Sequence, residues 1–121
     1  MFVFSDQKIA NTLEKKNNQN ISIKTLIDPD FIFRYYSEGL DMLGIALSNN
    51  CQYERENKPW KENIKTVGVA NLPQGDKLHH KFAVIDDNII ITGSHNWSAS
   101  ANHQNDETLL VIKNPLITRH Y

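Results

Sequence analysis

The chain has 121 residues, which fits one small domain with a single hydrophobic core. Thirteen Lys and Arg against fourteen Asp and Glu give a formal net charge of −1, which excludes a globally basic nucleic-acid-binding protein and leaves only local basic patches. Cys51 is the single cysteine, so no intrachain disulfide forms, and without a leader pattern or a membrane-length apolar run we expect a soluble, cytoplasmic protein.

The first quarter of the chain alternates strand and helix patterns. Residues 2–4, FVF, indicate a short buried strand, and Ser5 is the expected cap of a helix that runs to about Asn17. Residues 21–27 are rich in β-branched side chains and predict a second strand, which ends before Pro29. This strand–helix–strand order favours a parallel sheet with a right-handed crossover.

The middle of the chain is less regular. A helix is predicted from Phe31 to about Leu43 with Asp30 as its cap, and Gly39 weakens that prediction. The polar residues 48–63 predict a surface loop. A third strand is expected over residues 66–72, followed by a turn over residues 73–76.

The last third predicts a hairpin followed by short elements. Two apolar runs are joined by a turn at residues 86–88. After the hairpin we expect one helical turn over residues 98–102, a strand over residues 108–113, and a helix opened by Asn114 and Pro115. We find no repeat and no linker, so the chain is interpreted as one α/β domain, residues 1–121.

The hairpin carries the side chains with chemical potential. In a strand, the spacing of two residues places His79 and Lys81 on one face and His80 on the other. The returning strand delivers Ser94 and Asn96 to a strand end, where the preceding glycine permits close backbone approach. These groups together predict a site for an anion that a histidine attacks.

The same residues resemble a known signature. His79, Lys81, Asp86, Gly93, Ser94 and Asn96 match H-x-K-x4-D-x6-G-S-x-N, the HKD motif of the phospholipase D superfamily. The following segment, NWSASANHQNDETLLVI, resembles the region after the motif in the superfamily's bacterial nucleases, in which Glu107 fits a glutamate of the site. The specific part of the resemblance covers residues 77–112.

This resemblance implies a fold and a mechanism. The fold is a phospholipase D-like mixed β-sheet flanked by helices, here expected to lack the usual first strand and helix and to have a truncated last helix. The mechanism is phosphodiester hydrolysis through a phosphohistidine on His79, with no metal or other cofactor. The implied site consists of Lys81, Ser94 and Asn96 as phosphate-binding groups, Glu107 as the residue that orients an imidazole, and Asp86 as a structural or supporting carboxylate.

Three functional classes remain open. A nuclease that cleaves DNA or RNA is favoured because the chain is short and resembles the small single-motif bacterial endonucleases. A phospholipid hydrolase or transferase uses the same chemistry, and a non-catalytic truncated remnant is the third class. One motif supplies one histidine, whereas the mechanism needs both a nucleophile and an acid, so we expect a two-fold homodimer with a shared site.

Other side chains are weaker candidates for substrate contact. His95 and His103 lie near the motif, although no zinc-like ligand spacing accompanies them. Trp60 and Tyr53 are candidates for base stacking because they lie in a polar loop, whereas Trp97 is expected to pack in the core. Four lysines either follow a phosphate backbone or form a solvated face, namely Lys58, Lys61, Lys65 and Lys77.

Overall fold

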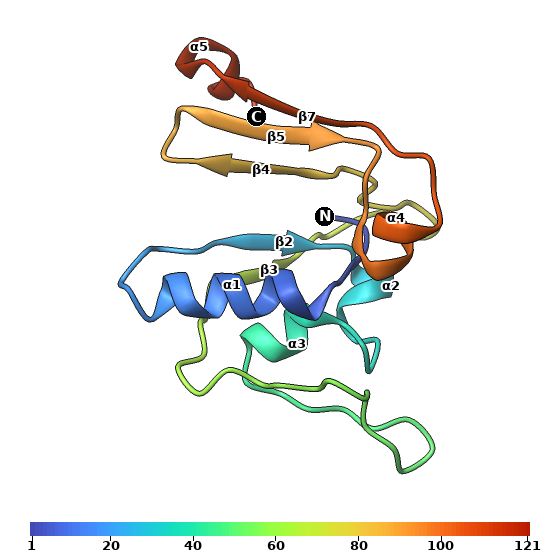
Figure 1. Cartoon of the computed structure of the whole chain (residues 1–121). Coiled ribbons are helices and arrows are strands. Elements are labelled where there is room, and N and C mark those ends of the chain that lie inside the picture. The colour runs from blue at the N-terminus through green and yellow to red at the C-terminus, as the bar shows by residue number, and fades with distance from the viewer.

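The computed structural model describes all 121 residues and contains seven short strands and five helices (Figure 1). In chain order the elements are β1 (Phe4–Ser5), α1 (Gln7–Asn17), β2 (Thr25–Ile27), α2 (Pro29–Ile32), α3 (Glu38–Met42), β3 (Val67–Val69), β4 (Phe82–Ile85), β5 (Ile89–Gly93), β6 (Trp97–Ser98), α4 (Ala99–His103), β7 (Leu109–Lys113) and α5 (Pro115–Thr118). No helix has the length and apolar composition needed to cross a bilayer.

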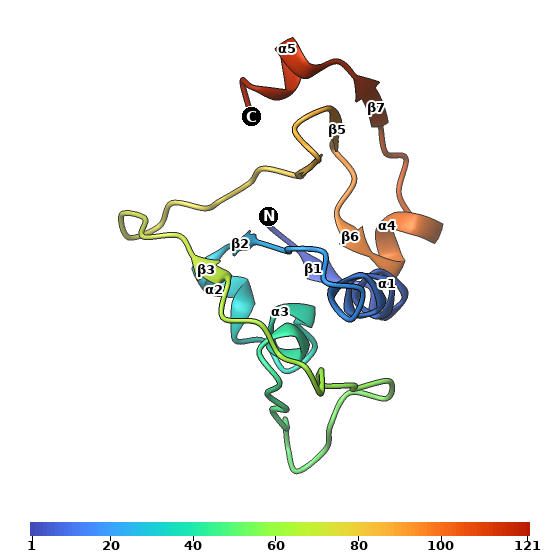
Figure 2. The ribbon, with the colours of Figure 1, turned by 90° about the vertical axis from the view of Figure 1, so that its left-hand side faces the viewer.

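The strands form parallel and antiparallel groups. β1 pairs with β6 and β2 pairs with β3, both in parallel, while β4, β5 and β7 form an antiparallel sheet. Backbone hydrogen bonds also join Met1 to Leu26 and to Asp28, so the start of the chain lies beside β2. Figure 2 shows β5 and β7 on one side of the molecule and the helices α1, α2 and α3 on the other. The predicted mixed α/β architecture is therefore observed.

The hydrophobic core lies between β1, β2 and the first three helices. Its members are Phe4, Ala10, Ile27, Phe31, Ile32, Met42 and Trp60. Trp60 is only 3% exposed, so its expected role as a stacking platform is wrong. Trp97 packs edge-on against Phe4 with ring centroids 5.7 Å apart, which confirms its expected packing role.

The beginning of α1 corrects the predicted cap. Asp6, not Ser5, is the N-cap, because its carboxylate accepts hydrogen bonds from the backbone N–H groups of Lys8 and Ile9. The helix ends at Asn17 as predicted. Ser5 instead belongs to β1, where it pairs with Ser98.

The predicted helix from Phe31 to Leu43 is in fact two short helices. Asp28, rather than Asp30, caps the first through the backbone N–H of Asp30, and Pro29 occupies the first helical position. The second helix starts after Ser37. It contains Gly39, and the position requires a glycine because a Cβ atom there would collide with the side chains of Ile27 and Ile32. Tertiary packing, which local propensity does not report, therefore decides this segment.

Other boundaries are shorter than the sequence patterns indicate. The second strand covers only Thr25–Ile27 and the third only Val67–Val69. The first motif strand begins at Phe82, so His79 and Lys81 precede it instead of lying within it. The predictions of a helical turn after Trp97, of the last strand and of the helix capped by Asn114 are confirmed.

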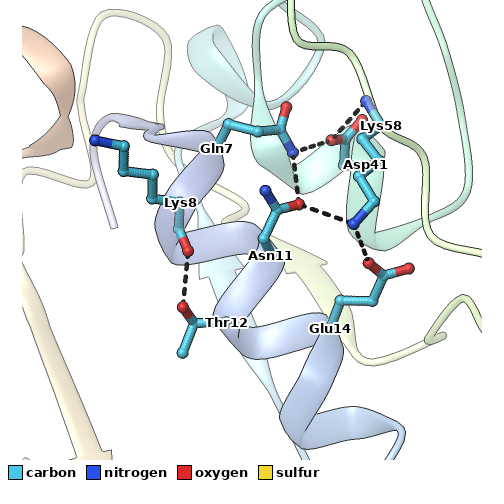
Figure 3. Close-up of polar contacts among 7 residues, drawn as sticks. All are labelled: Gln7, Lys8, Asn11, Thr12, Glu14, Asp41 and Lys58. Atoms are coloured by element: carbon cyan, nitrogen blue, oxygen red, sulfur yellow. Dashed lines mark hydrogen bonds and ion pairs between the residues drawn. The ribbon is translucent and has the colours of Figure 1, made fainter.

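A polar network ties α1 to α3 and to the loop that follows (Figure 3). The side-chain amide of Gln7 donates to Asp41 at 2.9 Å, and the ammonium of Lys58 contacts Asn11 at 3.3 Å and Glu14 at 3.0 Å. Lys58 is therefore occupied by an ion pair on the face of α1, which favours the solvated-face interpretation of this lysine.

A buried carboxyl group lies beside this network. Glu38 is 1% exposed and neither of its carboxyl oxygens has a hydrogen-bond partner. Burial, followed by the negative charges of Asp41 and Glu54, raises the pKa of Glu38 to about 9. Glu38 is consequently protonated at neutral pH, whereas the nearby Asp41 accepts hydrogen bonds from Gln7 and from the backbone of Lys58.

Candidate active site

Three strand ends bring the motif residues to one edge of the antiparallel sheet. The start of β4 lies beside the end of β5 because Phe82 pairs with Thr92, and the end of β5 lies beside the start of β7 because Gly93 pairs with Leu109. Figure 1 shows these ends together at the right-hand edge. Segments 79–81, 94–96 and 105–108 therefore converge, although they are separate in the sequence.

His79 and Lys81 are in direct contact. The Nζ atom of Lys81 lies 3.1 Å from Nε2 of His79 and donates to the backbone carbonyl of His79 at 3.0 Å. An ammonium has three donors and no acceptor, so this contact is a hydrogen bond only when Nε2 carries a free lone pair. The expected pairing is observed, but it results from Lys81 folding back rather than from strand alternation.

Lys81 is buried, whereas His79 is exposed. The lysine is 7% exposed, and burial lowers its pKa while the negative charge of Glu107 opposes that shift. His80 is also exposed, and its ring lies 6.3 Å from that of Phe82. The arrangement leaves His79 accessible to a ligand and holds the cation behind it.

The aromatic ring of Phe2 packs against the His79 and Lys81 pair. Its ring centroid is 5.0 Å from that of His79, and the ammonium groups of Lys81 and Lys77 lie 5.4 Å and 5.6 Å from the same centroid. These are cation–π distances. Sequence reasoning missed Phe2 because it lies 77 residues before His79 and showed only a strand pattern.

Ser94 and Glu107 form the second half of the site. The hydroxyl of Ser94 donates to Glu107 at 2.5 Å, and the amide of Asn105 donates to the other carboxylate oxygen at 3.1 Å. The bond from Ser94, and then that from Asn105, lowers the pKa of Glu107. Glu107 is thus ionised at neutral pH. Asn105 was not anticipated, and no imidazole hydrogen-bonds to this carboxylate.

Gly93 allows the close approach of β5 and β7. Its φ angle is +155°, and a Cβ atom at this position would collide with the backbone carbonyl of Thr108. The backbone N–H of Thr108 in turn donates to the Ser94 hydroxyl at 3.0 Å. The glycine of the motif is therefore needed to bring Ser94 to Glu107.

Asn96 and Asp86 occupy different surroundings. Asn96 lies directly before β6, and its amide oxygen is buried without a hydrogen-bond partner. Asp86 has a φ angle of +51° and lies exposed in the turn between β4 and β5, at the opposite end of β4 from Lys81. The structure therefore does not bring Asp86 together with the other motif residues, and its observed role is in the turn.

The remaining candidates differ in their contacts. The charge of His95 contributes to the lowered pKa of Glu107, whereas His103 is exposed at the end of α4. Lys77 pairs with Asp30 at 3.4 Å. Lys61 and Lys65 are exposed. No group of three or more His, Cys, Asp or Glu side chains is arranged to hold a metal ion.

A cavity of about 380 Å³ adjoins Phe2. It is lined by both polar and apolar residues, namely Phe2, Val3, Ser5, Asp28, Asp30, Phe31, Arg34, Tyr36, Lys77, Ser98 and Ser100. The cavity thus holds two cations, two carboxylates and several hydroxyl groups, and Phe2 links it to the His79 and Lys81 pair.

The chain is similar to known proteins along its whole length. Residues 1–121 match the family model described as cardiolipin synthase, PLD-like domain. A mitochondrial cardiolipin hydrolase of Xenopus laevis is 25% identical over 121 residues, which are 100% of this chain and 48% of that protein. The chain thus spans about half the length of this relative.

Two solved structures share the fold. NucT from Helicobacter pylori superposes with a TM-score of 0.70 at 20% identity, over 99% of this chain and 69% of that one. Nuc from Salmonella typhimurium, a phospholipase D family member, gives a TM-score of 0.69 at 20% identity, over 99% and 68%. The expected fold class is confirmed. Since the family model covers every residue, the chain belongs to the PLD-like domain family of the phospholipase D superfamily.

Proposed function

We propose that this protein is a metal-independent phosphodiesterase that cleaves nucleic acid, with His79 as the nucleophile. The observation that carries the proposal is the contact between Lys81 Nζ and His79 Nε2 at 3.1 Å. With Lys81 as an ammonium, the contact is a hydrogen bond only when Nε2 has a free lone pair, and that form of the imidazole attacks phosphorus. The buried ammonium beside it is placed to receive a phosphate oxygen.

The proposed reaction has two displacements. Nε2 of His79 attacks phosphorus, the P–N bond forms, and the P–O bond to the leaving group breaks while a second, protonated imidazole gives that oxygen its proton. The same second imidazole then takes a proton from water, which attacks phosphorus and releases His79. Lys81 and Asn96 bind the phosphate oxygens, and the unpartnered amide oxygen of Asn96 is available to a donor from the ligand.

Ser94 and Glu107 complete the proposed site. The hydrogen bonds that they share keep a negative charge within range of Lys81. This charge favours the protonated form of Lys81 against the effect of its burial. That Glu107 orients an imidazole remains a prediction. The imidazole in question is the second one of the proposed reaction.

The second imidazole comes, in our proposal, from an identical chain. One protomer supplies one His79, and a two-fold axis is the commonest way in which identical chains place two copies of a residue at one point. We therefore propose a homodimer with both copies of His79 at a shared phosphate. Excess His79→Asn chain, allowed to exchange subunits, should inhibit the wild type. Turnover by a monomer at the assay concentration would contradict the shared site.

Nucleic acid is the favoured substrate because residues 77–112 resemble the single-motif bacterial nucleases. The cavity beside Phe2 adds serine and tyrosine hydroxyls, while its cations Arg34 and Lys77 are offset by Asp28 and Asp30. A second candidate is a phospholipid such as cardiolipin. It is favoured by the name of the Xenopus laevis relative and by Leu109, Leu110 and Val111, which begin β7 beside the site and are 52%, 53% and 66% exposed. Such side chains are able to meet acyl chains.

Parallel assays separate the two substrates. Purified protein in excess EDTA should cleave labelled single-stranded DNA or RNA, and the cleavage should weaken steeply as salt rises. Vesicles of cardiolipin in phosphatidylcholine form the second arm. Hydrolysis of the vesicles without nucleic-acid cleavage would reverse the ranking. Activity that EDTA removes and Mg²⁺ restores would reject the histidine mechanism.

A further inference from the structure

A second cavity lies at the end of the loop that follows α3. It has a volume of about 310 Å³ and is lined by Tyr35, Tyr36, Asn49, Asn50, Gln52, Tyr53, Glu54 and Arg55. Three aromatic rings, three side-chain amides and one guanidinium therefore meet in a space within the usual size range of small-molecule sites, about 300–1,000 Å³. None of the motif residues lines it.

The loop wall of this cavity is a defined hairpin turn. Asn49 and Gln52 exchange backbone hydrogen bonds of 2.9 Å and 3.0 Å, and the two residues between them, Asn50 and Cys51, have φ angles of +51° and +62°. Successive positive φ angles are typical of a type I′ turn. The turn fixes the positions from which the amide side chains reach the cavity.

The aromatic wall is partly rigid and partly open. The ring of Tyr36 meets those of Tyr35 and Phe31 edge-on, with centroid distances of 5.0 Å and 5.7 Å. Tyr53, by contrast, is 61% exposed and has no aromatic contact. A contacting pair of rings and an exposed third ring line one cavity and offer stacking surfaces for a planar group.

Tyr36 connects this cavity to the candidate active site. It lines both cavities, and the first of them also contains Phe2 and Lys77, which lie against the His79 and Lys81 pair. A nucleic-acid strand bound at His79 thus has a path past Phe2 and Tyr36 to the hairpin. In Figure 1 the hairpin lies below α2, on the same side as the end of β5 and the start of β7.

Net positive charge does not account for binding of a nucleic acid along these two cavities. Arg34 and Arg55 are offset by the acids Asp30 and Glu54, which line the same cavities. Stacking on aromatic rings and hydrogen bonding to amides are, however, the two means by which proteins read unpaired bases. Asn and Gln side chains match the donor and acceptor pattern of a base edge.

We propose that the cavity between Tyr35, Tyr36 and the hairpin at residues 49–55 binds an unpaired nucleobase of the strand that is cleaved at His79. The inference rests on the proposed function, since it takes the substrate to be nucleic acid. It adds a base-binding site that none of the motif residues lines. Tyr53 is the side chain that closes over the base.

The test measures binding, not cleavage. In the full-length His79→Asn protein, the affinity for a fluorescent single-stranded oligonucleotide is compared with that for the same oligonucleotide carrying abasic positions. Tyr53→Ala should weaken binding of the intact strand by about fivefold to 100-fold and leave binding of the abasic strand unchanged. Tyr53→Phe retains the ring and should bind as the parent protein does.

Phe33→Ala is the matched control, because Phe33 is 65% exposed and lines neither cavity. It should change neither affinity. Equal affinity of Tyr53→Ala and its parent for the intact strand, or equal losses on both strands, would overturn the nucleobase site. If the wild type hydrolyses only lipid vesicles yet base-dependent binding through Tyr53 is present, the proposed function fails and the site stands.

Discussion

The two sides of the molecule differ in what holds them together. The side formed by β1, β2 and helices α1 to α3 contains every member of the hydrophobic core cluster, from Phe4 to Trp60. In the sheet of β4, β5 and β7 only Ile90 is fully buried, and Val84, Ile85, Leu109, Leu110 and Val111 are exposed. The first side is held by packing and the second mainly by ladder hydrogen bonds.

This difference separates stability from chemistry. His79, Ser94 and Glu107 all belong to the side with little packing, so removal of their functional groups leaves no cavity in the core. Phe2, two residues before β1, contacts the ring of His79 and links the site to the start of the chain. We therefore expect some substitutions to abolish activity in a folded protein and others to unfold the protein.

The same contrast applies to two glutamates. Glu38 is buried without partners and its pKa is raised, whereas Glu107 has two donors and its pKa is lowered. Burial penalises the charged form, and hydrogen bonds from Ser94 and Asn105 favour it. Ionisation of Glu38 therefore lowers the stability of the fold, whereas Glu107 remains ionised beside Ser94.

The largest expected effect is on activity. His79→Ala should lower phosphodiester cleavage by about 10³-fold or more, because the proposed nucleophile is lost. The matched control is His80→Ala, whose imidazole contacts Phe82 instead of Lys81 and which should retain most of the activity. Turnover and far-UV circular dichroism are measured for both. Equal losses in two folded variants would refute the assignment of the nucleophile.

A matched pair of truncations tests the packing difference directly. Ile27→Ala removes a fully buried side chain and should lower the free energy of unfolding by about 2–5 kcal/mol. Leu110→Ala removes a side chain of equal size that is 53% exposed and should cost less than about 1 kcal/mol. Urea denaturation measures both. Similar values for the two variants would show that β7 is packed in solution by something else, such as a second chain.

Gly93→Ala should affect stability and activity together. The added Cβ atom collides with the carbonyl of Thr108. We therefore expect the free energy of unfolding to fall by more than about 1 kcal/mol and Ser94 to separate from Glu107. Gly75→Ala is the control, because Gly75 also has a positive φ angle, +91°, but no atom lies near its Cβ position. An active, fully stable Gly93→Ala protein would contradict this account of the motif glycine.

The most gradual effect is a pH dependence of stability, spread over several pH units. The pKa of Glu38 is about 9 in the folded protein, so between its ordinary value of 4.5 and about 9 the folded state holds a proton that the unfolded state has lost. The contribution of Glu38 is therefore complete below pH 4.5 and declines by up to about 1.4 kcal/mol per pH unit as the pH rises through this window. Glu38→Gln should flatten the decline in Tm between pH 5 and 9. An unchanged slope would show that Glu38 is hydrated.

Local patterns predicted much of the secondary structure. The end of α1 at Asn17, the strand at residues 109–113 and the helix capped by Asn114 follow from periodicity and capping chemistry. The helix expected over residues 31–43 was not one helix, because Gly39 must pack against Ile27 and Ile32 and no local signal encodes that contact. Trp60 was misplaced for the same reason: a polar neighbourhood in sequence does not reveal a core position.

By itself the sequence determined which side chains are available for the chemistry, since His79, Lys81, Ser94, Asn96 and Glu107 follow a specific spacing, and the match over the whole chain shows the family. Only the tertiary structure decided how they meet. Lys81 folds back onto His79 outside any strand, Phe2 supports both, Asn105 shares Glu107 with Ser94, and Asp86 lies at the far end of β4. The physical reason is that these contacts join segments far apart in the chain, and their geometry depends on strand pairing and packing that no local pattern contains.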